Sequence, residues 1–194
     1  MDADIMNEEI IKRKKRLSSF QIIILGFAGV ILLGALLLML PIATKERVVT
    51  PFHETLFTAT SATCVTGLVV QDTGSYWSVF GQAILLFLIQ IGGLGVVTVA
   101  AAFTMLSGKK ISLMQRSTMQ EAISAPQVGG IVRLTGFILK GTFLIELVGA
   151  FCLMPLFVKD FGVKGIWYAF FHSVSAFCNG GFDLLGTADN RFVS

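Results

Sequence analysis

One twelve-residue stretch of this chain occurs twice, in diverged form, 114 positions apart. The first copy covers residues 57–68 (FTATSATCVTGL) and the second covers residues 171–182 (FHSVSAFCNGGF). Five positions coincide without a gap: Phe57/Phe171, Ser61/Ser175, Ala62/Ala176, Cys64/Cys178 and Gly67/Gly181. The same offset relates Pro41 to Pro155, and each proline is predicted to end the preceding apolar helix. A repeat that keeps a glycine and a proline at constant spacing indicates one structural unit used twice.

The apolar run before the first copy is long enough to cross a bilayer. Residues 20–42 contain no charged side chain. As a helix they would measure about 34 Å, against a hydrocarbon core of about 30 Å. With 54% hydrophobic and only 14% charged residues, the chain is predicted to be an all-α integral membrane protein. Its polar, basic first nineteen residues do not resemble a cleavable signal peptide.

The segment after this span is predicted to enter the membrane without crossing it. Thr50 can cap a helix, Pro51 suits its first turn, and Glu54 favours its positive end. A helix from there to about Thr63 covers only half a bilayer, and extended backbone follows at residues 64–70. Such backbone is tolerated at membrane depth only where protein buries it or where it lines water. The segment therefore predicts a re-entrant hairpin.

Two further spans are expected, at about residues 79–106 and 134–158. The glycines within residues 90–95 (QIGGLG) favour close helix packing or a kink. Gln90 needs a partner, which is either a neighbouring helix or pore water. A carboxylate such as Glu146 costs free energy at mid-bilayer unless it has a partner, so Glu146 is expected to face protein or water. Structural pairing is favoured over a direct role in transport, and both stay open.

These segments divide the chain into a basic N-terminus, one complete helix–pore loop–helix unit, a linker, and a second unit without its outer helix. A second short helix is expected at residues 165–177. The predicted bounds are 1–19, 20–106, 107–133 and 134–194.

Basic residues are distributed asymmetrically about the predicted spans. One side carries Lys12, Arg13, Lys14, Lys15, Arg16, Lys109, Lys110, Arg116 and Arg133. The other side carries Lys45, Arg47, Lys159, Lys164 and Arg191, offset by six acidic residues. The positive-inside rule then places the N-terminus in the cytoplasm. A nucleic-acid patch is the alternative interpretation of the run at 12–16, but a topogenic anchor accounts for it better, and no nucleic-acid partner is expected.

The two loops contain the residues that a cation filter needs. Carbonyl oxygens can replace the hydration shell of an ion, and glycine lets the backbone point them inward. The predicted ion-binding residues, acting mainly through backbone carbonyls, are Thr63, Cys64, Val65, Thr66 and Gly67 in the first loop and Cys178, Asn179, Gly180 and Gly181 in the second. Each preceding short helix directs its negative end to the same region. A single TxTG sequence could be an ordinary helix-ending turn, but its duplication in register favours a pore.

Three segments resemble the Trk/Ktr/HKT superfamily of potassium transporters. TATSATCVTGLVVQDTG (58–74) and LIQIGGLGVVT (88–98) resemble its first repeat, and SVSAFCNGGFDL (173–184) resembles its second pore loop. Within the superfamily the similarity is closest to the bacterial Ktr-type membrane subunit. It extends over nearly the whole chain from about Phe20.

The resemblance implies a function and a set of partners. Family members fold as four successive helix–pore loop–helix units that resemble a potassium channel, and each loop contributes one filter glycine, here Gly67 and Gly181. Glycine at the first position goes with potassium permeation, and serine with sodium-preferring relatives. The chain is thus expected to translocate potassium across the plasma membrane as a multi-pass protein. It would bind no cofactor and be stimulated by sodium. It would also form a homodimer on a cytoplasmic ring of nucleotide-binding regulatory subunits, which the 107–133 linker would contact.

The sequence departs from the family pattern in three ways. Cys64 stands where a small hydroxyl residue is usual, and Gly180 stands where alanine is common. Neither change removes a backbone carbonyl. The third departure is length, because units three and four are absent, and the sequence is expected to be the N-terminal part of a longer transporter.

Three alternatives stay open at this stage. A small channel subunit could complete its pore by oligomerising, and a non-conducting fragment could assemble with or regulate a larger cation transporter. An enzyme is disfavoured, because His172, Cys178 and Asp183 surround the predicted filter without a supporting base or ligand set. For His53 and His172, packing or an interfacial hydrogen bond is favoured over catalysis. The three cysteines, Cys64, Cys152 and Cys178, show no spacing typical of a disulfide framework or a transition-metal site.

Overall fold

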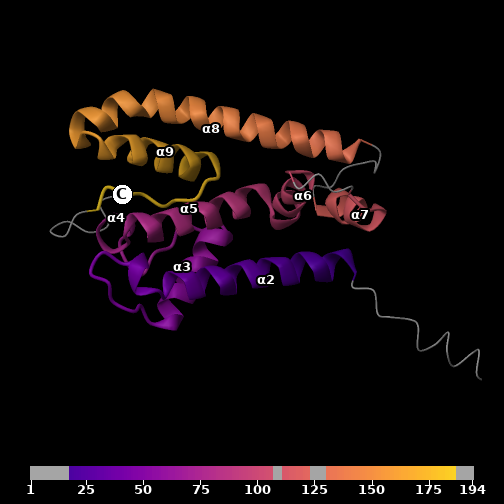
Figure 1. The fold of residues 1–194 in the computed structure, drawn as a ribbon, viewed down its shortest axis with the longest axis horizontal. Coiled ribbons are helices and arrows are strands. Elements are labelled where there is room, and N and C mark those ends of the chain that lie inside the picture. The colour runs from indigo at the N-terminus through magenta and orange to yellow at the C-terminus, as the bar shows by residue number, and fades with distance from the viewer. Residues whose placement is uncertain (1–17, 107–110, 123–129, 187–194) are drawn as a thin grey trace, which may run out of the picture.

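The computed structural model describes residues 18–106, 111–122 and 130–186, and regular structure in these ranges is helical (Figure 1). The predicted all-α class is therefore confirmed for the described residues. The elements are α2 (Ser19–Leu38), the 3-10 turn η1 (Pro41–Ala43), α3 (Phe52–Thr63), α4 (Thr73–Tyr76), α5 (Val79–Leu94), α6 (Val96–Leu106), α7 (Leu113–Ala122), α8 (Ile131–Phe161) and α9 (Lys164–Phe177).

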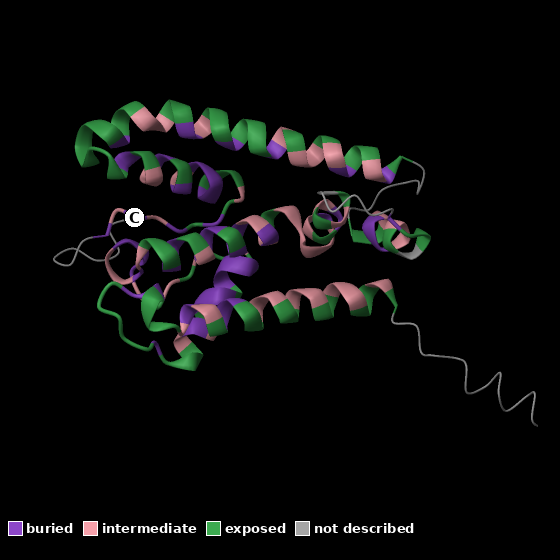
Figure 2. Ribbon diagram, in the orientation of Figure 1, coloured by how far each residue is buried: buried purple, intermediate pink, exposed green. Residues whose placement is uncertain are grey.

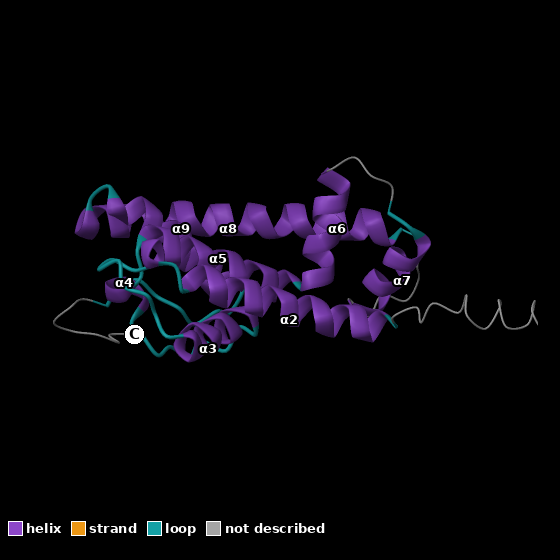
Figure 3. Cartoon of the chain, turned by 60° about the horizontal axis from the view of Figure 1, so that its bottom comes forward, coloured by secondary structure: helices purple, strands orange, loops and turns teal. Residues whose placement is uncertain are grey.

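Helices α2 and α8 are long and apolar enough to cross a membrane. They lie on opposite sides of the structure with α5 between them (Figures 1 and 3). A capping box starts α2, because Ser18 Oγ accepts from the Gln21 amide and Gln21 Oε1 accepts from the Ser18 amide. Both helices expose large apolar side chains, such as Phe20 (68% exposed) and Phe137 (74% exposed). Surfaces of this kind are stable in lipid rather than in water. Figure 2 shows exposed positions, in green, along both helices.

Residues 79–106, predicted as one span that could contain a kink, do not form one continuous helix. Helices α5 and α6 are separate, and their axes are bent by 100° at Gly95, so α6 stands across α5 in Figure 3. Gly95 adopts a φ of +81°, which a glycine reaches without steric cost and which no α-helical residue has. Its amide donates to the Gly92 carbonyl and closes the end of α5. Of the two predicted roles for the glycine motif, a kink is confirmed at Gly95.

Two local predictions about helix ends are also wrong. Pro155 does not end its helix, because α8 continues to Phe161 and closes at Gly162. A proline inside a helix removes only its own amide bond, and the following turns here keep theirs. Thr50 does not cap α3 either. Its hydroxyl pairs with the hydroxyl of Tyr76 at 2.9 Å, and no side chain of the described residues caps this helix.

The two short helices share α5 as a neighbour. Helix α3 packs between α2 and α5, and α9 packs on α8 and against the other face of α5. The buried core follows these contacts, and its members include Leu38, Ala59, Ala62, Leu85, Ile89, Phe171 and Val174. Purple in Figure 2 accordingly concentrates on α3 and on the loop end of α9. As a result, the two copies of the repeat come together beside one helix.

The predicted linker at 107–133 contains α7 and the first residues of α8. Residues 107–110 and 123–129 of that linker, and the basic run at 12–16, lie outside the described residues.

Candidate functional site

The two repeated loops have the same backbone conformation at matched positions. Val65 has a φ of +56° and its counterpart Asn179 has a φ of +58°. Two residues later, Gly67 and Gly181 have φ values of +75° and +70°. A β-branched residue such as valine rarely adopts positive φ, so the first loop holds Val65 in a strained conformation. The repeat in sequence is therefore also a repeat in geometry.

The hydrogen bonds that end the two short helices are matched as well. Cys64 N donates to Thr60 O at 2.8 Å, and Cys178 N donates to Val174 O at 2.9 Å. Two further pairs of bonds match in the same way. Val65 N donates to Ala62 O, as Asn179 N donates to Ala176 O. Thr66 N donates to Ser61 O, as Gly180 N donates to Ser175 O. Thr63 is the last residue of α3 rather than a loop residue, and its buried hydroxyl has no hydrogen-bond partner among the described residues.

Gly67 and Gly181 lie in contact with each other. A Cβ atom built on Gly181 would lie 2.9 Å from Gly67 Cα, and one built on Gly67 would lie 3.1 Å from Gly181 Cα. Neither residue could carry a side chain without moving the opposite loop. Each needs glycine for two reasons, its positive φ and this close approach.

The serines at matched positions 61 and 175 tie each loop to its own helix. Ser61 Oγ accepts from Thr66 Oγ1 at 2.9 Å. Ser175 Oγ donates to Phe182 O at 2.7 Å and accepts from Phe182 N at 3.2 Å. The sequence alone marks these serines only as repeat positions. Their coincidence in register is the signal that could have identified them as loop anchors.

Gly92 and Gly93 of α5 form the surface against which both loops pack. A Cβ on Gly92 would collide with the carbonyl of Thr63, and one on Gly93 would collide with Sγ of Cys178. The first loop thus packs on one glycine and the second loop on the next. The bend at Gly95 follows two residues later. Close packing was one of the two roles predicted for these glycines, and it is confirmed, with the loops as the packing partner.

Gln90 and Glu146 satisfy each other beside the second loop. Gln90 Nε2 donates to Glu146 Oε1 at 2.9 Å, and Glu146 is only 2% exposed. Cys178 Sγ lies 3.9 Å from Gln90 Oε1 and 4.0 Å from Glu146 Oε1. Ser173 Oγ also donates to the backbone carbonyl of Glu146. The predicted structural pairing of Glu146 is confirmed.

The electrostatics of the loop junction depend on the ends of the two short helices and on the residues of the two loops. The C-terminal ends of α3 and α9 both point to this junction, and carbonyl groups there carry partial negative charge. Residues 63–67 and 178–181 include no Asp, Glu, Lys or Arg. Within these two segments the negative potential therefore comes from backbone dipoles, while the Glu146 carboxylate lies beside the second loop, 4.0 Å from Cys178 Sγ.

His172, Cys178 and Asp183 do not form a common site. His172 Nδ1 pairs with Tyr168 O at 2.7 Å, Nε2 accepts from Leu184 N at 3.3 Å, and the ring stacks on Phe157. Asp183 Oδ1 accepts from Leu185 N at 2.8 Å. These contacts confirm a packing role for His172.

Long apolar helices, a bent helix pair and two short helices with closely packed loops define an integral membrane protein. The TrkH family model, described as "Cation transport protein", matches residues 12–194, and the chain belongs to that family.

Several curated proteins are similar to this chain. It is 44% identical over 174 residues to the potassium/sodium uptake protein NtpJ of Enterococcus hirae, an alignment that covers 89% of this chain and 39% of that protein. It is 44% identical over 165 residues to the Ktr system potassium uptake protein B of Bacillus subtilis, covering 84% and 37%. It is 38% identical over 175 residues to the protein of the same name from Vibrio alginolyticus, covering 90% and 38%. The chain thus spans less than two fifths of the length of these relatives.

Proposed function

We propose that this chain is an ion-translocating part of a potassium uptake system. Its family consists of cation transport proteins, and relatives at 38–44% identity are named for potassium or potassium/sodium uptake. The single observation that carries the proposal is the contact between Gly67 and Gly181. It joins two loops of equal geometry at the ends of two half-length helices.

In this proposal the loops form part of a selectivity filter. Potassium exchanges its hydration water for backbone carbonyls of Thr63, Cys64, Val65, Thr66 and Gly67 in the first loop and of Cys178, Asn179, Gly180 and Gly181 in the second. The ion then moves down the membrane potential. Two loops supply only part of a ring of carbonyls, and further pore loops would complete it. Each helix–pore loop–helix unit would resemble one subunit of a potassium channel.

The proposal also includes the membrane and the partners. The protein resides in the plasma membrane with its N-terminus in the cytoplasm, as the asymmetry of basic residues favours. Two copies form a homodimer on a cytoplasmic ring of nucleotide-binding regulatory subunits, which the 107–133 linker contacts. Sodium stimulates uptake without being a resident cofactor.

Flux measurements test this function. The protein, in the form in which its native membrane contains it, is reconstituted into liposomes, and potassium, sodium and chloride fluxes are measured under an imposed membrane potential. Potassium flux above that of protein-free liposomes, with little chloride flux, is expected. Absence of cation flux, with the regulatory partner present as well as absent, would leave the chain as a non-conducting assembly subunit.

A further inference from the structure

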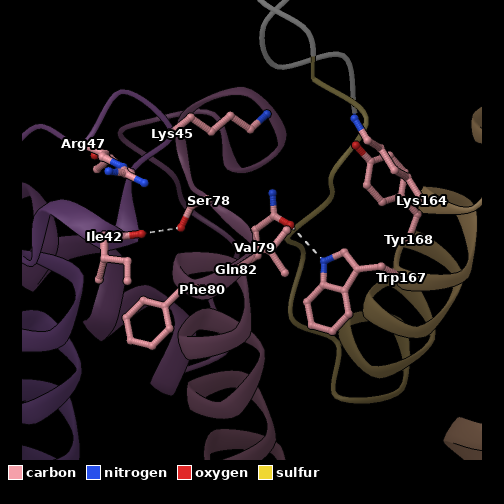
Figure 4. Close-up of a pocket in the computed structure, with 11 residues that line it drawn as sticks. Ile42, Lys45, Arg47, Ser78, Val79, Phe80, Gln82, Lys164, Trp167 and Tyr168 are labelled. Atoms are coloured by element: carbon pink, nitrogen blue, oxygen red, sulfur yellow. Dashed lines mark hydrogen bonds between the residues drawn. The ribbon is translucent and has the colours of Figure 1, made fainter.

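A basic cavity of about 640 Å³ lies at the loop end of the structure, apart from the Gly67–Gly181 junction. We call it the outer pocket, and it is formed where the N-terminal ends of α5 and α9 approach the segment after α2 (Figure 4). Its wall includes three cations: Lys45, Arg47 and Lys164. None of the described residues that line it is acidic. A cavity of this charge attracts an anion and repels a cation, so it is unsuited to the path of the transported ion.

The described residues leave most hydrogen-bond donors of the three cations unused. Lys45 Nζ donates to the Gly74 carbonyl at 2.5 Å, which uses one of its three N–H groups. Within the described part of the chain, neither Arg47 nor Lys164 has a hydrogen bond or ion pair through its side chain. In Figure 4 the charged ends of all three side chains lie on the upper side of the pocket.

The lower side of the outer pocket is apolar and exposed. Ile42 is 59% exposed, Val79 is 65% exposed and Phe80 is 42% exposed. Figure 4 places these side chains below the charged groups. Trp167 and Tyr168 also line the pocket, and tryptophan and tyrosine are enriched at membrane interfaces. A ligand with a negative head and apolar chains matches both sides of this pocket.

The base of the outer pocket is held in place by hydrogen bonds. Trp167 Nε1 donates to Gln82 Oε1 at 2.9 Å, and Gln82 Nε2 donates to Trp77 O at 3.1 Å. Gln82 is only 3% exposed, and it joins α5 to α9 across the two repeats. A site preformed in this way loses little free energy to reorganisation when a ligand binds.

We propose that the outer pocket binds the anionic headgroup of a membrane phospholipid from the outer leaflet. The phosphate lies against Arg47 and Lys164, and the acyl chains lie along Ile42 and Phe80. The proposal rests on the membrane orientation proposed above, but not on potassium selectivity. A lipid bound there contacts α5 and α9 together and therefore stabilises the contact between the two repeats.

Lipid binding is measured by native mass spectrometry of the detergent-purified protein, titrated with phosphatidylglycerol. Phosphatidylcholine with the same acyl chains is the lipid control. Lys164→Gln should weaken binding of one phosphatidylglycerol about fivefold, and Arg47→Gln with Lys164→Gln about 25-fold, because each interfacial cation contributes a similar attraction to an anionic lipid. Lys45 is left intact because its bond to Gly74 supports the fold.

Lys159→Gln is the matched control, because Lys159 is also exposed, lies five positions away, and does not line the pocket. It should change binding less than twofold, and Lys164→Arg should bind as the parent does. Equal effects of Lys159→Gln and Lys164→Gln would overturn the proposal. So would equal affinity for the two lipids, or displacement of phosphatidylglycerol by millimolar inorganic phosphate, which would indicate a site for a free anion. None of these readouts depends on ion flux, so failure of the filter assignment would leave the test valid.

Discussion

Gln90 donates its side-chain amide to the carboxylate of Glu146 across 2.9 Å and thereby joins α5 to α8 inside the apolar part of the protein. Burying either side chain alone in such surroundings costs free energy, and the hydrogen bond between the two offsets part of that cost. The pair also lies within 4.0 Å of Cys178 Sγ, at the start of the second loop. It therefore positions that loop as well as the two helices.

Replacing Glu146 by leucine should destabilise the protein by about 1–3 kcal/mol, because the Gln90 amide would be left buried without a partner. Glu146→Gln keeps an acceptor for that amide and should cost less. Thermal unfolding of the detergent-solubilised protein measures the difference. If the glutamine variant were destabilised as much as the leucine variant, the carboxylate would act through its charge rather than through this bond.

Gly92→Ala should destabilise the protein by about 1–3 kcal/mol, because the new methyl group would overlap the Thr63 carbonyl and force the first loop away from α5. Gly141→Ala is the matched control, since Gly141 is also helical and no atom of the described residues lies within 4 Å of the position that its methyl group would take. Alanine there should be neutral or stabilising by up to about 1 kcal/mol. Equal melting temperatures for the two variants would show that α5 does not support the loop.

Alanine substitutions of Ser61 and Ser175 are expected to have different effects on the hydrogen exchange of backbone amides. Ser175→Ala removes the acceptor of the Phe182 amide, so hydrogen exchange at that amide should accelerate about tenfold, as expected for the loss of about 1.4 kcal/mol. Ser61→Ala should leave the Thr66 amide protected, because that amide donates to the backbone carbonyl of residue 61. Equal acceleration at both amides would contradict the roles assigned to the two side chains.

Two exposed positions test the membrane orientation. Val163 is 84% exposed between α8 and α9, and Leu113 is 79% exposed at the start of α7. In cells, a membrane-impermeant maleimide should label Val163→Cys from outside, and should label Leu113→Cys only after permeabilisation. The parent protein gives the background from its own three cysteines. The opposite pattern would invert the proposed orientation.

Much of the candidate site followed from the sequence, because the repeat placed two glycine-containing loops after two short helices. The sequence could not show that Gly67 and Gly181 lie in contact, since that contact depends on how α3 and α9 pack on opposite faces of α5. Similarly, Gln90 and Glu146 were each expected to need a partner, but nothing in a separation of 56 positions identifies one as the partner of the other.

The errors in the predicted fold have local physical causes. Residues 79–106 are mostly apolar and include no charged residue, so their composition predicts one span, while the bend depends on the φ of a single residue, Gly95. Pro155 was expected to end its helix, as Pro41 does near α2, but one missing amide donor was insufficient to stop α8. The cations of the outer pocket were counted only as loop charges, because they come from segments far apart in the sequence.

The filter assignment makes the most direct functional prediction. Gly67→Ser should raise sodium relative to potassium permeation, because serine resists a φ of +75° and its Cβ would press on Gly181, so the carbonyls of both loops must shift. A strain of about 1 kcal/mol that acts unequally on the two ions would change their flux ratio about fivefold.

Gly162→Ser is the matched control for this change. Gly162 also has a positive φ, of +60°, and no atom of the described residues lies within 4 Å of the position that its Cβ would take, so serine there imposes similar backbone strain away from the loops. Sodium and potassium fluxes are measured in liposomes reconstituted with the protein in the form found in its native membrane. The control should lower stability without changing the flux ratio. If Gly67→Ser also left the ratio unchanged, or if both variants changed it equally, carbonyls at the Gly67–Gly181 junction would not be the source of ion selectivity.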